Sequence, residues 1–257
     1  MSTASTQLAT DHHMRVDLVS SKPKRVLIVM AHPDDGEFSS GGTLARWASE
    51  GADIHYCLVT DGQAGDQGDT EITSEQLAAK RRREAQGAAD ELGVKNKVIF
   101  LGYPDSRLEP TLQLRSDIAR VIRKVRPDIV ICQDPTRWWS DGYINHPDHR
   151  IAGESVMGAI IPVAGTRLAF PELAAEGLAP WEVKEVYVAG ASNPTRWIDI
   201  TNFIDRKIAA LRAHKSQMRD WDPAERVTQW AKLNAQEARK HGHEFEMAES
   251  FGYIKRG

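Results

Sequence analysis

Short apolar runs alternate with amphipathic segments along most of the chain, and this alternation limits the fold more than any other feature of the sequence. The run at 25–31 is continuously apolar after its first residue, as in a strand that is covered on both faces. Further strands are predicted at 53–59, 97–101, 128–132 and 183–191, and helices at 40–50, 74–92, 112–125 and 149–161. The pattern predicts an α/β fold with a Rossmann-like, doubly wound, mostly parallel sheet and helices on both faces.

The C-terminal part of the chain is predicted to be helical, with helices at 204–215 and 224–240. A length of 257 residues allows one large domain or two small ones. Because no repeat or low-complexity tract divides the chain, we expect a flexible leader at 1–23 and a single domain at 24–257. The segment 168–180 is interpreted as a long loop.

Composition excludes several classes of protein. The 33 Lys and Arg residues nearly balance the 36 Asp and Glu residues, so the overall charge does not favour binding to nucleic acid. No apolar run is long enough for a membrane span, and the polar N-terminus lacks the apolar core of a secretory signal. Cys57 and Cys132 lie within apolar runs, where buried thiols are expected. We therefore expect a cytoplasmic protein, and leave a homo-oligomer open.

A histidine and three acids follow the first predicted strand within six residues. The carboxyl edge of a parallel sheet is where ligands bind. Zinc favours imidazole nitrogen and carboxylate oxygen, and a catalytic zinc site combines three protein ligands with one open position. His32 and Asp35 can face one ion if Pro33 turns the chain, which leaves Asp34 free to act as a base. The alternative is a polar turn in which Asp34 or Asp35 caps the following helix.

A second cluster follows the fourth predicted strand, again with histidine beside proline and aspartate, at 146–149. Because parallel strands end at the same edge of a sheet, the two clusters can converge. His149 would then complete a set of two histidines and one carboxylate with His32 and Asp35. His146 is left as an acid, with Asp148 to orient a ring nitrogen. The alternative is that both histidines only cap the helix that follows.

These two segments resemble the LmbE-like or PIG-L family of zinc-dependent deacetylases, which remove the N-acetyl group from N-acetylglucosamine-containing compounds. The resemblance rests on His-Pro-Asp-Asp at 32–35 with Gly-Gly-Thr at 41–43, and on His-Pro-Asp-His at 146–149. Weaker matches, such as His-Lys-Ser-Gln at 214–217, extend it over residues 25–250.

The resemblance implies a hydrolase that removes an N-acetyl group from an N-acetylglucosamine-type amino sugar or its conjugate, a small-molecule partner. It implies that His32, Asp35 and His149 hold Zn²⁺, with Fe²⁺ as a substitute, and that the ion activates the attacking water. It also implies that Asp34 is the general base, and that His146 stabilises the oxyanion or protonates the amine. The group attached to the sugar stays open: a thiol-sugar conjugate, a chitooligosaccharide or an antibiotic glycoside.

Three further residues match positions at which relatives contact the substrate, or lie close to such positions. Arg81 and Asp105 match positions that contact its hydroxyls or phosphate, although Arg81 can equally be a surface charge. Some relatives carry a tyrosine two residues before the second motif, whereas Tyr143 lies three residues before His146. Many relatives have glutamate directly after the two aspartates, where this chain has Gly36.

Two other functions fit parts of the pattern. Two histidines and one carboxylate also hold Fe(II) in non-haem oxygenases, but such an enzyme needs no water-activating base, so Asp34 favours hydrolysis. A nucleotide-binding module is disfavoured because no Gly-x-Gly-x-x-Gly follows the first strand. Trp138 and Trp139 precede the second cluster, where they can form a wall for a sugar ring or pack in the core.

Overall fold

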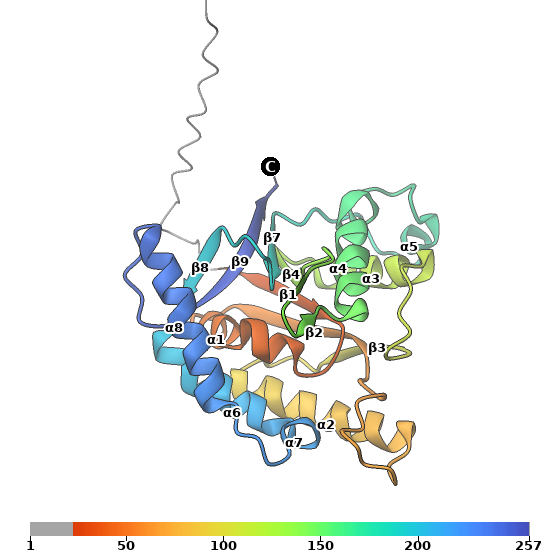
Figure 1. The fold of residues 1–257 in the computed structure, drawn as a ribbon. Helices are drawn as coiled ribbons and strands as arrows, with labels where there is room; N and C mark the ends of the chain where they lie inside the picture. The colour runs from red at the N-terminus through yellow and green to blue at the C-terminus, as the bar shows by residue number, and fades with distance from the viewer. Residues whose placement is uncertain (1–22, 257) are drawn as a thin grey trace, which may run out of the picture.

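The computed structural model describes residues 23–256, and in this part of the chain one seven-stranded sheet forms the centre (Figure 1). The strands of this sheet are β1 (Arg25–Met30), β2 (Asp53–Thr60), β3 (Ile99–Tyr103), β4 (Ile129–Gln133), β7 (Glu185–Ala189), β8 (Arg196–Asp199) and β9 (Ala248–Lys255). Their order is β3-β2-β1-β4-β7-β9-β8. The first five strands of this order are parallel, and β9 runs antiparallel to both β7 and β8. The predicted mostly parallel sheet is confirmed.

Helices cover both faces of this sheet (Figure 1). They are α1 (Asp35–Ser49), α2 (Ser74–Leu92), α3 (Leu112–Val125), α4 (Pro147–Gly158), α5 (Pro171–Ala175), α6 (Ile204–Ala213), α7 (Lys215–Met218) and α8 (Ala224–Lys240). A π-helical turn, η1 (Ala159–Ala164), continues α4, and a 3-10 turn, η2 (Thr201–Phe203), precedes α6. A hairpin of β5 (Trp139–Ser140) and β6 (Tyr143–Ile144) lies between β4 and α4.

Side chains of β1 alternate between two hydrophobic cores, as the two-residue period of a strand requires. Val26, Ile28 and Met30 pack in a core with α1, α2 and α6, whereas Leu27 and Val29 pack in a core with α3 and α4. All five side chains are fully buried. The continuous apolar run of the sequence is therefore explained by helices on both faces.

The chain order of the strands reverses at β1. From β1 the chain first adds β2 and β3 on one side, and then returns to add β4 on the other side. In doubly wound sheets a crevice opens at this switch point, outside the carboxyl ends of the strands. The loops that follow β1 and β4, which carry the two histidine clusters, therefore lie side by side.

The structure corrects one predicted helix start and one predicted loop, and it adds two strands that were not predicted. Helix α1 begins at Asp35 and not at residue 40, because poor helix formers in its first turns hide its true start. Segment 168–180 holds the short helix α5 and is not all loop. Strands β8 and β9 are not predicted by the sequence, since β8 has only four residues and β9 is not continuously apolar.

Two expectations concern the ends of the chain and its relation to membranes. The leader predicted at 1–23 lies, apart from its last residue, outside the part of the chain that the structure describes. None of the helices in the described part has the length and apolar character needed to cross a bilayer.

Candidate active site

Residues 32–35 connect β1 to α1 and place the first cluster at the switch point. Asp34 has a positive φ of 94°, which is uncommon for residues other than glycine. It occupies the position before α1, yet its side chain makes no capping hydrogen bond. The alternative in which Asp34 serves as a helix cap is therefore wrong, and its carboxylate is available for another role.

Side chains from the two clusters meet at short distances. His32 Nδ1 lies 3.2 Å from His149 Nε2, and the Asp35 carboxylate lies 3.3 Å from His32 Nδ1 and 3.1 Å from His149 Nε2. Two ligands of a tetrahedral zinc ion with bonds of about 2.0–2.1 Å lie about 3.3 Å apart. The spacing and the donor types of these three side chains therefore fit a metal ion.

A glutamine at the end of β4 orients Asp35. Gln133 Nε2 donates to Asp35 Oδ2 at 3.0 Å, and Gln133 Oε1 accepts from the backbone N–H of Ala31 at 2.9 Å. The backbone N–H of His32 donates to the same Asp35 oxygen at 2.8 Å. Gln133 was not among the residues that the sequence singled out. The signal that could have found it is a buried amide at the carboxyl end of the strand beside β1.

Two buried carboxylates face the other ring nitrogen of His32. Asp105 Oδ1 lies 3.0 Å and Asp148 Oδ2 lies 3.4 Å from His32 Nε2. The backbone N–H of Ala64 donates to Asp105, and that of Ser106 donates to Asp148. Histidine ligands of metals are commonly oriented by such a carboxylate. The sequence predicted that Asp148 orients a histidine ring nitrogen, and in the structure Asp148 faces Nε2 of His32. Because Asp105 is buried in this role, its expected contact with substrate stays a prediction.

These carboxylates place strong negative charge around His32. Burial lowers the pKa of His32, but the charge of Asp35 and the hydrogen bonds to Asp105 and Asp148 outweigh this effect and raise the pKa to about 12. Burial raises the pKa of Asp34 to about 6, against the opposing charge of Arg81. A cation bound between His32 and Asp35 would balance this charge. The charge of the donor set, like its spacing, therefore fits a metal ion.

Arg81 holds Asp34 in place. Its Nη2 donates to the Pro33 carbonyl oxygen at 2.6 Å and to Asp34 Oδ2 at 3.2 Å, and its Nη1 donates to the Gly62 carbonyl oxygen at 2.9 Å. Gly62 has a φ of +67°, and a Cβ there would lie 2.3 Å from Arg81 Nη1. Arg81 is only 4% exposed. The alternative of a surface charge is wrong, and a contact between Arg81 and substrate stays a prediction.

His146 lies beside the two predicted histidine ligands. Its ring centroid is 4.8 Å from that of His32 and 5.2 Å from that of His149. His146 Nδ1 accepts a hydrogen bond from the backbone N–H of Asp148 at 3.2 Å, so His146 caps α4, as the alternative interpretation of the second cluster predicts, whereas His149 lies inside the helix. The matching neutral tautomer of His146 carries its proton on Nε2. Burial and the neighbouring histidines lower the pKa of His146, which favours this neutral form.

Two other groups of side chains have spacings that could hold a metal ion, and both contain His32. One group is His32, His146 and His149, and the other is His32, Asp105 and Asp148. In the first group, one nitrogen of His146 is already occupied by the Asp148 N–H. In the second, both acids face Nε2 of His32, the ring nitrogen away from Asp35 and His149. The set that includes Asp35 has separations of 3.1–3.3 Å between its side chains, which are close to those of tetrahedral ligands, and its choice over the other two stays a prediction.

A cavity of about 510 Å³ opens on Asp35 and His149. Tyr143 and Trp138 line one side of it, with ring centroids 5.1 Å apart. Trp139 is 71% exposed and does not line the cavity. Of the two tryptophans that the sequence proposed as a wall, the structure places only Trp138 there. Tyr143 lines the cavity, where contact with a substrate stays a prediction.

Comparison with known proteins agrees with this geometry. The sequence profile of PIG-L, described as GlcNAc-PI de-N-acetylase, matches residues 27–160. Diacetylchitobiose deacetylase of Thermococcus kodakarensis is 36% identical over 205 residues, which cover 78% of this chain and 74% of the relative. The chain belongs to the PIG-L family.

Solved structures of similar fold include N,N'-diacetylchitobiose deacetylase from Pyrococcus horikoshii complexed with its inhibitor MPG. It has a TM-score of 0.80 and 29% identity, and the match covers 91% of this chain and 84% of that chain. GalB, the 4-carboxy-2-hydroxymuconate hydratase of Pseudomonas putida KT2440, has a TM-score of 0.75 and 25% identity, with 91% and 97% covered. A hydratase has this fold as well. The reaction of a PIG-L family protein therefore has to be argued from its site and not from its fold.

The family predicted from the two motifs is thus confirmed, and so is the α/β fold. The PIG-L match and the deacetylase relatives do not favour the oxygenase alternative. Members of the PIG-L family are generally metal-dependent. This member has groups of His and Asp side chains with a spacing that could hold a metal ion, and the ligand set of His32, Asp35 and His149 stays a prediction.

Proposed function

We propose that this PIG-L family protein is a zinc-dependent hydrolase that removes the N-acetyl group from an N-acetylglucosamine-type amino sugar or its conjugate. The observation that carries the proposal is a set of three side chains, His32, Asp35 and His149, with separations of 3.1–3.3 Å, and Asp35 is next to Asp34 in the sequence. The cavity that opens on this set gives room for a sugar. The name of the Thermococcus kodakarensis relative supports the substrate class.

His32, Asp35 and His149 would hold the ion. Two imidazoles and one carboxylate favour zinc, although Fe(II) also accepts this donor set. When bound, such an ion lowers the pKa of a water molecule and polarises the carbonyl of the amide. The two carboxylates that face Nε2 of His32 fix its ring, which would leave Nδ1 to hold the ion.

Asp34 serves as the general base in this proposal. Its carboxylate is adjacent in sequence to the ligand Asp35, and Arg81 fixes one of its oxygens. The other carboxylate oxygen makes no hydrogen bond with the described residues, so it can accept the proton of the attacking water. A positioned base of this kind contributes about 10²–10⁴-fold to the rate.

His146 stabilises the charge that develops on the carbonyl oxygen. Because its Nδ1 accepts from the Asp148 N–H, its Nε2 carries the proton and can donate to that oxygen. The leaving amine also needs a proton, which either His146 Nε2 or protonated Asp34 can supply. A location in the cytoplasm and assembly into a homo-oligomer stay predictions of the sequence.

The deciding experiment measures acetate released from a panel of N-acetylated amino sugars by the zinc-loaded protein. We expect release by the wild type and a large loss in Asp34→Asn that retains its metal. Consumption of oxygen without acetate would favour the oxygenase alternative, and addition of water without acetate would favour a hydratase. Either result would overturn the proposal.

A further inference from the structure

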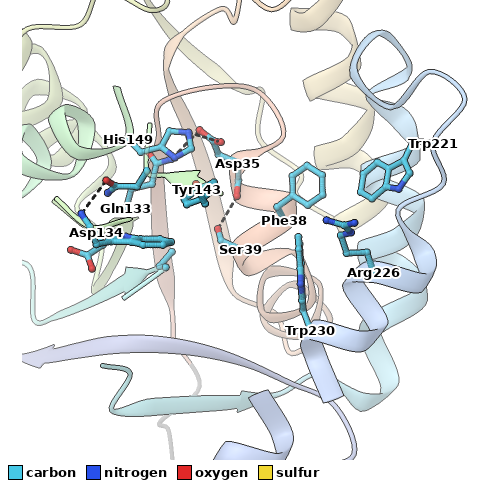
Figure 2. Close-up of a pocket in the computed structure, with 14 residues that line it drawn as sticks. Asp35, Phe38, Ser39, Gln133, Asp134, Tyr143, His149, Trp221, Arg226 and Trp230 are labelled. Carbon is cyan, nitrogen blue, oxygen red and sulfur yellow. Dashed lines mark hydrogen bonds and ion pairs between the residues drawn. The ribbon is translucent and has the colours of Figure 1, made fainter. Parts of the chain in front are cut away.

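The cavity has a second wall, on the side away from Trp138 and Tyr143. Figure 2 shows Trp221, Arg226 and Trp230 on this side, with Phe38 between them and Asp35. Phe38 lies on α1 one turn after Asp35, whereas Arg226 and Trp230 lie one turn apart on α8. We name Phe38, Trp221, Arg226 and Trp230 the α8 wall.

Two aromatic rings of the α8 wall, those of Trp221 and Trp230, flank a guanidinium group, and both rings also contact Phe38. The Phe38 ring stacks on Trp221 at 6.2 Å and lies 6.5 Å from the Trp230 ring. The guanidinium carbon of Arg226 lies 6.0 Å from the Trp221 ring and 5.9 Å from the Trp230 ring. The two tryptophans are 42% and 44% exposed, which is a large apolar area to leave beside a catalytic cavity.

The buried face of α8 is distinct from the face that carries Arg226 and Trp230. Helix α8 packs on the core mainly through its buried face, where Val227, Ala231 and Ala235 are at most 3% exposed. Arg226 and Trp230 lie on the exposed side of the helix, where Trp230 contacts Phe38 of α1 and Arg226 contacts the two tryptophan rings. The position of the Arg226 charge along the cavity therefore calls for an explanation other than packing.

Arg226 has no carboxylate partner among the described residues. Its contacts there are the two tryptophan rings. The acids that line the cavity are engaged elsewhere: Asp35 with Gln133 and His149, and Asp134 with Thr136. A guanidinium stacked between rings keeps its N–H donors free, and their fork geometry matches a carboxylate or a phosphate.

We propose that the α8 wall is the subsite for the group attached to the amino sugar, and that this group carries a carboxylate or a phosphate. The inference rests on the proposed function. The N-acetyl group lies at the metal end of the cavity in this arrangement, the sugar ring lies against Trp138 and Tyr143, and the attached group extends to Arg226.

The test compares three N-acetylglucosaminides of matched anomeric configuration: the methyl glycoside, the glycolate glycoside and the 1-phosphate. We expect kcat/KM of the wild type to be about 10–100-fold higher for at least one anionic substrate than for the methyl glycoside, mainly through KM. Arg226→Gln should lose this preference and keep its activity on the methyl glycoside. The glycolate and phosphate arms tell which anion is recognised.

Lys232→Gln is the matched control, because it removes the same charge from an exposed position on α8 that does not line the cavity. It should keep the preference for the anionic substrate. Equal kcat/KM of the wild type on all three substrates would overturn the inference. So would an equal loss on neutral and anionic substrates in Arg226→Gln.

The inference can be tested even if the proposed function fails, that is, if no substrate releases acetate. Binding of N-acetylglucosamine 1-phosphate and of the glycolate glycoside is then measured by calorimetry. Binding of either ligand to the wild type that weakens at least tenfold in Arg226→Gln, and not in Lys232→Gln, supports the subsite. The subsite is overturned if neither ligand binds the wild type, or if Arg226→Gln binds them with the same affinity as the wild type.

Discussion

Asp34 and Asp35 are adjacent and chemically identical, yet the fold gives them different surroundings. Asp35 lies between the two histidine nitrogens and accepts from Gln133, whereas Asp34 is held by Arg81. The positive φ of Asp34 turns the backbone between the two side chains. Their roles therefore follow from backbone geometry and not from residue type.

Because of this difference, replacing each aspartate by asparagine should impair a different property of the protein, metal binding in one variant and turnover in the other. Asp35→Asn should weaken metal binding, because a neutral amide replaces an anionic ligand. Asp34→Asn should keep the metal and lose about 10²–10⁴-fold in kcat. Metal content after dialysis and steady-state rates of acetate release check both. If Asp34→Asn loses the metal while Asp35→Asn retains it, the two roles are reversed.

His146 separates two possible ligand sets. Because its Nδ1 already accepts from the Asp148 N–H, His146→Gln should retain full metal content and lose about 10²–10³-fold in kcat, the usual effect of removing one oxyanion donor. His149→Ala serves as the comparison and should lose the metal. Metal loss in His146→Gln would instead support the set of His32, His146 and His149.

A substitution of Arg81 tests whether this residue contacts the substrate, as the sequence predicts, or instead positions Asp34. Its guanidinium is bonded to two backbone carbonyls and to Asp34. Arg81→Met should therefore lower kcat by about 10²-fold through misplacement of the base and leave KM nearly unchanged. Arg83→Met, at an exposed position on the same helix, is the control and should behave as wild type. A rise in KM at constant kcat would show direct contact with substrate.

At the scale of elements, the approach of α4 to β4 positions His149. A Cβ on Gly153 would lie 2.3 Å from the Gln133 carbonyl oxygen, so the helix lies directly against the end of the strand. His149 is one helical turn before Gly153, and Gln133 holds Asp35. One close contact between two elements thus sets the distance between two of the three predicted ligands.

Gly153→Ala is expected to separate α4 from β4. The added methyl group meets backbone, so the free energy of unfolding should fall by about 1–3 kcal/mol, and metal affinity should fall with it because His149 moves. Denaturant unfolding and a metal titration measure the two effects. Gly87→Ala in α2, where the new Cβ meets only ordinary contact, should be neutral or stabilising by up to about 1 kcal/mol. Unchanged affinity in Gly153→Ala would contradict this account.

The elements that the sequence predicts well are those with a strong local signal. The predicted helices 112–125 and 224–240 coincide with α3 and α8. The antiparallel strands β8 and β9 have no such signal, because their pairing joins segments about 50 residues apart in the chain. The first residue of a helix is also predicted wrongly where poor helix formers begin it, as in α1.

The residues of the site likewise divide into those with a local sequence signal and those without one. Residues of the two motifs are predicted because each motif is local, and parallel strand ends must lie at one edge. Gln133 and Arg226 are not predicted, since their relevance depends on which distant segment they face. The burial of Arg81 beneath the loop after β2 is likewise a tertiary contact, and the sequence around it resembles an exposed helix surface.

At the scale of the whole molecule, the predicted ligands join three segments: His32 after β1, Asp35 in α1 and His149 in α4. An ion that binds only the folded chain stabilises it by about 2.7 kcal/mol when free ion is at 100 times Kd. For a chain of this size, 1 kcal/mol shifts Tm by about 2–4 °C. Removal of the metal by a chelator should therefore lower Tm by roughly 5–10 °C. Scanning calorimetry with and without chelator measures this shift, and His149→Ala should show none. Equal shifts in wild type and His149→Ala would mean that the stabilising ion binds elsewhere.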